Sequence, residues 1–252
     1  MKKIFVLVSC LLLLSCNQNL HEGANSYNGV NNYIDDDCSN TPYKLVWDYP
    51  VKPGMEEWKR FQTNEEMVKA CQIPDKVLSS LSTKELTEIC LQYPLLSSVF
   101  AFNQLNMGAD KLFNDFNGIR ELFKRKDASK GLLQHYNCLM QGFEDEKSFL
   151  QVWNLEFLLG FYTQKTDILS KEDCKEMLQD LLYGHEKEIV YYDPNFSYPY
   201  PYNFYGRVQI ILKISPQSLE KIPGKELNGV FNGWIDKETM DIINELSYQL
   251  IK

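Results

Sequence analysis

One acidic residue lies inside the most apolar helical pattern of the chain. On a helix over residues 145–162, Glu156 falls on the same side as Phe149, Val152 and Trp153. A carboxyl group on such a face loses solvation, which raises its pKa and suits it to general acid or base catalysis. The same position suits a structural hydrogen bond from a tyrosine or backbone neighbour. We favour the structural role and keep catalysis by Glu156 as the alternative.

A second pair of reactive side chains stands at helical spacing. His135 and Cys138 are three residues apart, so they are neighbours on a helix surface, as a thiolate and its base would need. No local carboxylate or oxyanion hole accompanies them. We therefore expect a chance adjacency and no catalytic residue.

Metal and cofactor motifs are missing from the sequence. His21, His135 and His185 lie in separate segments, and no Cys-x-x-Cys occurs. The acidic run Asp35–Asp37 lacks the spaced oxygens and turn glycine of a calcium loop. We expect no metal site and no cofactor.

Five cysteines follow the first sixteen residues, so at least one has no partner within a monomer. Their leading interpretation is that of small buried apolar residues. Cys71 with Cys90 is the disulfide that we would test, and the pairing of the others stays open. The five are Cys38, Cys71, Cys90, Cys138 and Cys174.

The densest basic cluster is Arg120, Lys124, Arg125 and Lys126. Cations at the C-terminus of a helix complement its macrodipole, which is the interpretation that we favour. Binding of an anionic glycan or lipid headgroup is the alternative.

Aromatic residues gather between Tyr191 and Tyr205, interspersed with prolines that argue against a regular helix there. Tyrosine offers a flat apolar face with a polar edge, which suits sugars and peptides. We expect a Tyr/Pro-rich loop that binds a ligand through Tyr198, Tyr200 and Tyr202, together with Trp58. Packing of this loop onto the helices is the alternative.

The first sixteen residues are typical of a targeting signal. Lys2 and Lys3 precede an apolar run that is long enough for a leader and too short to span a bilayer. The run ends in Leu13-Leu14-Ser15-Cys16, which resembles the lipobox of bacterial lipoprotein precursors. The resemblance implies cleavage before Cys16, acylation of its thiol, and an anchor in the membrane, with the outer membrane favoured because Asn17 follows.

Residues 17–45 are rich in Asn, Gly and Ser and show no helical or strand period. A flexible chain of this length has a root-mean-square reach of roughly 30 Å. We expect a tether that carries the helical domain, residues 46–252, away from the lipid surface.

Capping signals and helical periods dominate from Trp47 onward. Helix starts are marked at Thr63, Ser82 and Ser170, and Asp236 precedes the last helix. Residues 112–126 are predicted to form one continuous helix. Residues 206–214 fit a strand or a helix, and we lean towards a helix because no partner strand is evident. The fold class is therefore all-α, either an orthogonal bundle or a short array of helical hairpins.

Composition excludes one class of partner. Lys plus Arg number 26 against 34 for Asp plus Glu, a net charge of -8. A nucleic-acid backbone would be repelled on average, so we expect no nucleic-acid partner.

Several stretches in residues 47–135 resemble uncharacterised helical lipoproteins and surface proteins of Gram-negative anaerobic bacteria. The resemblance implies a helical body in the cell envelope and no known activity. Together with the leader it predicts a lipid-anchored binding or assembly component for a glycan or an envelope protein; the alternatives are an envelope hydrolase using Glu156 and a purely structural lipoprotein. The stretches are Trp47-Asp48-Tyr49-Pro50 with Trp58, Ala70–Pro74, Leu81-Ser82-Thr83 with Glu85-Leu86, Tyr93-Pro94-Leu95, Phe116-Asn117-Gly118 and Arg125-Lys126-Asp127.

Overall fold

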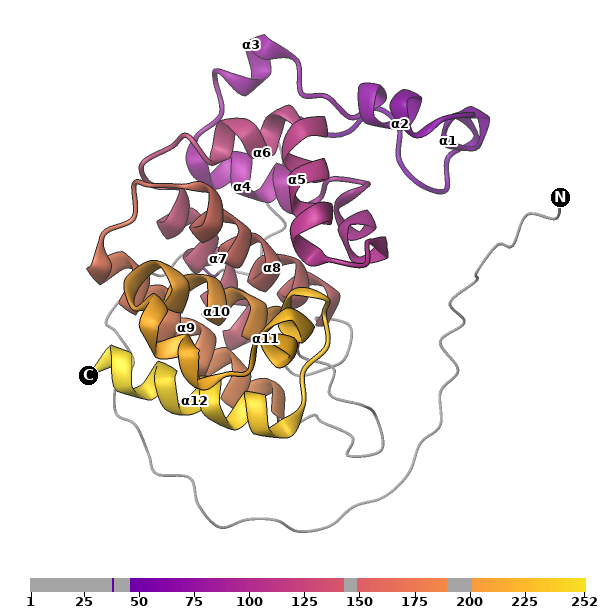
Figure 1. Cartoon of the computed structure of the whole chain (residues 1–252). Coiled ribbons are helices and arrows are strands. Elements are labelled where there is room, and N and C mark those ends of the chain that lie inside the picture. The colour runs from indigo at the N-terminus through magenta and orange to yellow at the C-terminus, as the bar shows by residue number, and fades with distance from the viewer. Residues whose placement is uncertain (1–37, 39–45, 143–148, 190–200) are drawn as a thin grey trace, which may run out of the picture. The chain divides into compact units, whose positions relative to one another are not determined.

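The structure is a computed structural model that describes residues 38, 46–142, 149–189 and 201–252 (Figure 1). By its contacts the chain divides into two units, Met1–Thr41 and Pro42–Lys252. The described helices all belong to the second unit. The leader, Cys16, Asp35–Asp37 and nearly all of the predicted tether lie outside the described residues.

The described part of the second unit contains twelve α-helices, two 3₁₀ helices and no strand, so the all-α prediction is confirmed. The first half consists of α1 (Glu56–Arg60), α2 (Asn64–Ala70), α3 (Asp75–Leu78), α4 (Thr83–Leu91), η1 (Leu96–Ala101), α5 (Leu105–Asp115), α6 (Asn117–Leu122) and α7 (Ala128–Gln141). The second half consists of α8 (Phe149–Lys165), α9 (Lys171–Glu188), α10 (Pro201–Ile214), η4 (Pro216–Lys221), α11 (Gly224–Phe231) and α12 (Lys237–Ile251).

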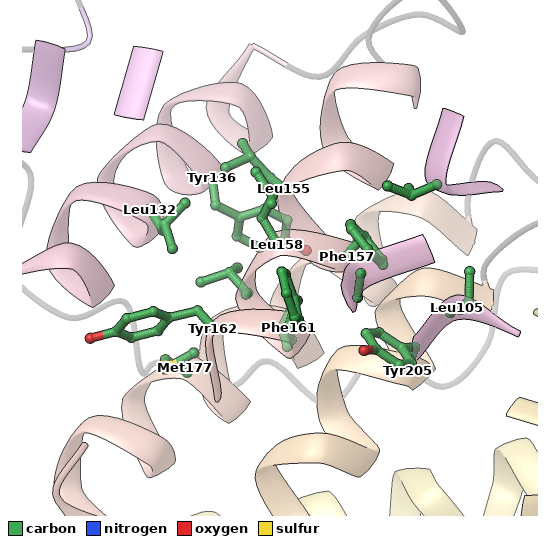
Figure 2. Close-up of a cluster of buried hydrophobic side chains, with 14 of the residues drawn as sticks. Leu105, Leu132, Tyr136, Leu155, Phe157, Leu158, Phe161, Tyr162, Met177 and Tyr205 are labelled. Carbon is green, nitrogen blue, oxygen red and sulfur yellow. The ribbon is translucent and has the colours of Figure 1, made fainter. Parts of the chain in front are cut away.

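Helix α8 is the interior helix of a bundle, as its apolar sequence predicts. Eleven of its 17 residues are buried, so hardly any face is left for solvent. Helices α7, α9 and α10 pack on it, and α4 reaches it from the N-terminal half. Figure 2 shows Leu155, Phe157, Leu158 and Phe161 of α8 within this core, with Tyr205 of α10 nearby.

The crossing of α8 and α10 depends on two glycines. A Cβ placed on Gly160 would lie 2.8 Å from the Cα of Gly206 and 2.9 Å from the ring of Tyr205. No real side chain tolerates such distances, so only glycine permits this approach of the two backbones. The close contact fixes α10 against the central helix.

All four of the predicted helix starts have a capping side chain. Thr63 accepts from the amide of Glu66 at the start of α2. Ser82 and Ser170 each accept from the third amide of their helix, and Glu85 and Asp173 reach back to the cap amide. Asp236 accepts from the amide of Thr239 at the start of α12. These side chains satisfy amides that would otherwise be unpaired at a helix N-terminus.

The prediction of one continuous helix over 112–126 is wrong. Phe116 has φ −114° and ψ 118°, which ends α5 and precedes α6. Its ring stacks on Tyr93 with centroids 4.0 Å apart, inside the core. The break at Phe116 coincides with the burial of this ring pair, although the apolar spacing passes unchanged through both short helices.

The predicted Tyr/Pro-rich loop is shorter than expected at its C-terminal end. Helix α10 begins at Pro201, so residues 201–205 are helical, and 206–214 is a helix and not a strand. Proline is compatible with the first turn of a helix, where its missing amide costs nothing. Residues 190–200 lie outside the described residues.

Among the described residues, no helix has the length and apolar character needed to cross a membrane.

Candidate functional site

Glu156 points into the protein, as its position on the apolar face of α8 predicts. Its side chain is fully buried. Tyr136 on α7 donates its hydroxyl to Glu156 Oε1 at 3.0 Å, and Asn203 on α10 donates its amide to the same oxygen at 2.6 Å. Glu156 therefore accepts a hydrogen bond from a tyrosine, as the structural role favoured from the sequence requires.

Asn203 joins a third helix to this arrangement. Its side-chain amide also donates to the backbone carbonyl of Leu181 on α9, at 2.9 Å. Through Tyr136 and Asn203, Glu156 on α8 is therefore connected to α7, α9 and α10.

Arg207 lies one turn after Asn203 and is fully buried. Its guanidinium donates to Ser247 Oγ at 2.9 and 3.0 Å, to Asn244 Oδ1 at 2.8 Å and to the carbonyl of Ile243 at 3.2 Å, all on α12. The same group lies 4.9 Å from the ring centroid of Phe204. Arg207 therefore fastens α12 to α10.

Two buried residues of α9, His185 and Glu188, complete this group. We call the six residues the buried polar network: Tyr136, Glu156, His185, Glu188, Asn203 and Arg207. They come from four helices, α7 to α10, that pack on one another (Figure 1).

Burial controls the protonation of the network. Desolvation raises the pKa of Glu156, although its hydrogen bonds and the charge of Arg207 oppose the shift. Desolvation and the charge of Glu156 raise the pKa of Glu188. Desolvation and the charge of Arg207 lower the pKa of His185 to about 3, so its imidazole is neutral at pH 7. Desolvation lowers the pKa of Arg207 to about 9, which leaves it charged at pH 7.

The network contains acidic and basic side chains, but all of its ionisable groups are buried. Glu156, Glu188 and Arg207 have no measurable exposure, and His185 is 5% exposed. Three atoms, Glu156 Oε2, Asn203 Oδ1 and Arg207 Nη1, have no hydrogen-bond partner in the part of the chain that the structure describes. A buried network of this kind is suited to fixing the positions of the helices, because a buried polar group that loses its hydrogen-bond partner is costly.

Metal ligands do not gather anywhere in the described residues: no group of three His, Cys, Asp or Glu side chains could hold an ion. A pocket of about 250 Å³ lies between α2 and α5, and none of the residues that line it belongs to the buried polar network. The residues that line it are mostly polar in type, although the surface that they present to the pocket is mostly apolar, and Lys111 pairs with Asp115 within it.

Aromatic side chains form a second feature, at the N-terminal ends of α8 and α10. Trp153 lies 5.7 Å from Tyr202 and 5.8 Å from Phe149, between ring centroids, and Tyr202 lies 4.3 Å from Phe100 of η1. All four rings are half-buried, and neighbouring Leu150 is 50% exposed. We call Phe100, Phe149, Trp153 and Tyr202 the aromatic strip.

The residues predicted to bind a ligand are not brought together by the described structure. Tyr202 lies in the first turn of α10 and its side chain contributes to the aromatic strip. Trp58 is half-buried on α1, where it packs against the core and meets Phe61 at 5.7 Å. Tyr198 and Tyr200 lie outside the described residues.

The basic cluster has a structural role, in line with the interpretation favoured from the sequence. Arg120 donates to the carbonyls of Phe113 and Asn114 at the end of α5. Arg125 donates to the carbonyl of Leu81, near the end of α3. These guanidinium groups satisfy carbonyls that a short helix leaves without a partner. Lys124 and Lys126 are exposed.

His135 and Cys138 do not form a catalytic pair. Cys138 is disulfide-bonded, as is Cys38, so its sulfur is no free thiol. His135 Nε2 lies 3.0 Å from Glu88 Oε2 on α4, a carboxylate that is distant in the sequence. The contact between His135 and Glu88 therefore links α7 to α4.

The other described cysteines are buried free thiols: Cys71, Cys90 and Cys174. The Cys71–Cys90 disulfide that we would test is thus wrong, and the interpretation of these residues as small buried apolar side chains is confirmed. Desolvation raises the pKa of Cys71 and of Cys174 to about 11, which keeps both thiols protonated and unreactive.

Sequence reasoning missed Glu188, Asn203 and Arg207 as neighbours of Glu156. The four-residue spacing of Asn203 and Arg207 places both on one face of a helix, but only if residues 201–205 are helical. Gly184 was a further missed signal. A Cβ there would lie 1.7 Å from the Tyr136 hydroxyl, so this glycine makes room for the donor to Glu156.

Comparison with known proteins gives no match for this chain, whether to a family model, to a curated protein or to a solved structure.

Proposed function

We propose that the chain is a lipid-anchored protein of the cell envelope that binds a glycan or an envelope protein and has no catalytic activity. The observation that carries the binding role is the aromatic strip. Its four half-buried rings come from η1 and from the beginnings of α8 and α10, and Tyr202, the ring on α10, lies two residues after Tyr200 in the sequence. Rings held by a rigid core lose little entropy when a ligand covers them.

The envelope location rests on the leader and on Cys16, which resembles an acylated lipoprotein cysteine. The disulfide bonds of Cys38 and Cys138 support it, because such bonds persist in oxidising compartments such as the periplasm. The net negative charge argues against nucleic acid as the partner. The resemblance of short stretches in residues 47–135 to helical lipoproteins implies the same location.

Thermal melting of the purified full chain in detergent tests the binding role. A panel of glycans, cell-wall fragments and envelope proteins is added, since a ligand that binds only the folded state raises the melting temperature. The proposal expects a saturable shift with one class of compound. If every compound leaves the melting temperature unchanged, the purely structural lipoprotein becomes the better account.

Substitution locates the binding surface. Tyr198→Ala with Tyr200→Ala is expected to weaken binding while the melting temperature without ligand stays close to that of the unmodified chain. Tyr183→Ala is the matched control, because Tyr183 is exposed on α9 and contributes nothing to the aromatic strip. Equal affinity in all variants would exclude this surface.

The hydrolase alternative depends on Glu156. The complete burial of Glu156 and its two hydrogen bonds favour a structural role. Turnover of any cell-wall fragment that disappears in Glu156→Gln, while binding of the fragment persists, would establish the enzyme instead.

A further inference from the structure

Among the described residues, Trp234 is the most exposed aromatic side chain, with 55% of its surface open to solvent. It lies just after α11, a helix that packs on α10 (Figure 1). The rings of the aromatic strip come from η1, α8 and α10, so Trp234 is a separate feature of the surface.

The end of α11 holds the backbone of Trp234 in one position. Gly233 has φ 73°, a left-handed conformation that favours glycine. The amide of Gly233 donates to the carbonyl of Val230 at 3.1 Å, and the amide of Trp234 donates to the carbonyl of Gly229 at 2.8 Å. These two bonds make up a Schellman motif, which ends a helix and fixes the direction of the residue that follows.

Gly229 makes room for the indole ring. A Cβ on Gly229 would lie 2.6 Å from Cε3 and 3.1 Å from Cζ3 of Trp234. Glycine weakens the interior of a helix relative to alanine, and an aliphatic side chain after Gly233 could supply the apolar contact of a Schellman motif. The chain instead combines a glycine with the largest apolar side chain and leaves more than half of that side chain in solvent. This combination positions an exposed ring at a cost to the helix.

Two neutral amide side chains accompany the ring. Asn228 and Asn232 are exposed, directly precede Gly229 and Gly233, and stand four residues apart, so they share one face of α11. Neither side chain has a hydrogen-bond partner among the residues that the structure describes. The Cε3–Cζ3 side of the indole contacts Gly229, and Nε1 belongs to the other side of the bicycle, so this contact does not use the N–H of Trp234.

We propose that Trp234 is a stacking platform for a pyranose ring of a neutral oligosaccharide, and that Asn228 and Asn232 bind the hydroxyl groups of the sugar. A pyranose has C–H groups on its faces and hydroxyl groups at its edge, which matches an aromatic face beside side-chain amides. An amide donates and accepts hydrogen bonds, as each hydroxyl does. The site is independent of the aromatic strip and does not rest on the binding role proposed for it.

A lipid surface is a poorer match for this part of the chain. Insertion into a headgroup region is driven by a continuous apolar area. In residues 202–252, whose exposure the structure describes, Trp234 is the only large apolar side chain that is exposed. A single ring beside amides fits a sugar better than a bilayer.

Fluorine NMR of the full chain, labelled with 5-fluorotryptophan and held in a detergent without a sugar headgroup, tests the proposal. The sequence has four tryptophans, and Trp234→Phe and Trp153→Phe identify the resonances of the platform and of the aromatic strip. Cellohexaose, maltohexaose and the hexamer of N-acetylglucosamine are added up to millimolar concentrations. At least one of them is expected to shift the Trp234 resonance saturably. A Trp234 resonance that none of them moves would overturn the proposal, whereas the Trp153 resonance reports separately on the aromatic strip.

Two variants test the geometry in the same titration. Gly229→Ala keeps the indole but places a methyl group against Cε3, so the ring must move and the saccharide should bind about tenfold more weakly. Gly224→Ala in the same helix, where no atom lies within 4 Å, is the matched control and should bind as the unmodified chain does. Asn232→Ala should weaken binding about two- to tenfold through the loss of a hydrogen bond.

Two results would overturn the assignment. One is an unchanged affinity in both Gly229→Ala and Asn232→Ala. The other is a Trp234 resonance that responds to anionic lipid vesicles and to no saccharide, which would assign the ring to the membrane surface.

Discussion

Replacing Glu156 by leucine should destabilise the fold far more than replacing it by glutamine. Glu156 Oε1 accepts from two buried donors, Tyr136 and Asn203. Asn203 keeps its bond to the Leu181 carbonyl, so leucine deprives mainly the Tyr136 hydroxyl of an acceptor, which costs about 1–3 kcal/mol. Arg207 also loses a nearby carboxylate, and an uncompensated buried charge costs about 3–5 kcal/mol.

Part of that loss is recovered. Leucine no longer needs desolvation of a carboxyl group, which opposes the ionised form of Glu156 in the unmodified chain. We therefore expect Glu156→Leu to lose about 3–4 kcal/mol of unfolding free energy. Glutamine also removes the negative charge near Arg207, but it retains an oxygen that accepts both hydrogen bonds, so Glu156→Gln should lose about 1–3 kcal/mol less than Glu156→Leu.

Urea denaturation followed by far-ultraviolet circular dichroism gives both values. Glu245→Leu, at an exposed position in α12, serves as the control and should change stability by less than about 0.5 kcal/mol. A leucine variant as stable as the unmodified chain would refute the claim that the fold needs this acceptor. Equal damage from glutamine would show that the negative charge, and not the hydrogen bonds, is what matters.

Three further predictions concern packing, capping and acid stability. Gly184→Ala should lose at least about 2 kcal/mol in the same denaturation assay, because the new methyl group meets Tyr136, whereas Gly224→Ala, where no atom lies within 4 Å, should be nearly neutral. Arg125→Ala should lower the unfolding free energy by about 1–2 kcal/mol through its lost bond to the Leu81 carbonyl, and Lys124→Ala, at an exposed position, should not; equal stability of the two would contradict the capping role. Because the pKa of His185 is lowered to about 3, the unfolded chain binds a proton more readily than the folded one below about pH 6.5. Its contribution to stability is therefore lost as the pH falls from 6.5 towards 3, and His185→Gln should show a smaller acid loss than the unmodified chain.

The sequence is informative where a signal is local. Ser170 with Asp173, and Asp236, predict the starts of α9 and α12 because a cap involves residues only three apart. The interior position of α8 and the inward direction of Glu156 follow from its apolar pattern.

Features that depend on distant residues could not be predicted. The helix breaks at Phe116, whose ring stacks on the distant Tyr93, and the uninterrupted apolar spacing gives no sign of this contact. Asn203 meets Glu156 across 47 residues of sequence. Glu88 likewise meets His135 across 47 residues, so the contact through which His135 joins α7 to α4 could not be predicted.

The prolines before α10 led the sequence analysis to predict a loop where the helix begins. They argue against a helix, yet Pro201 lies in the first turn, where proline is tolerated. Once residues 201–205 were assigned to a loop, Asn203 and Arg207 could not be placed on the face that meets α8, α9 and α12.

The proposed envelope role depends first on the acylation of Cys16, and one measurement tests it most directly. Cells producing the full chain are labelled with a radioactive fatty acid, and their membranes are then fractionated. The account predicts that the chain carries the label, that it sediments with the outer membrane, and that Cys16→Ala abolishes both while Cys10→Ala changes neither. An unlabelled chain, or one whose label and location survive Cys16→Ala, would contradict the account.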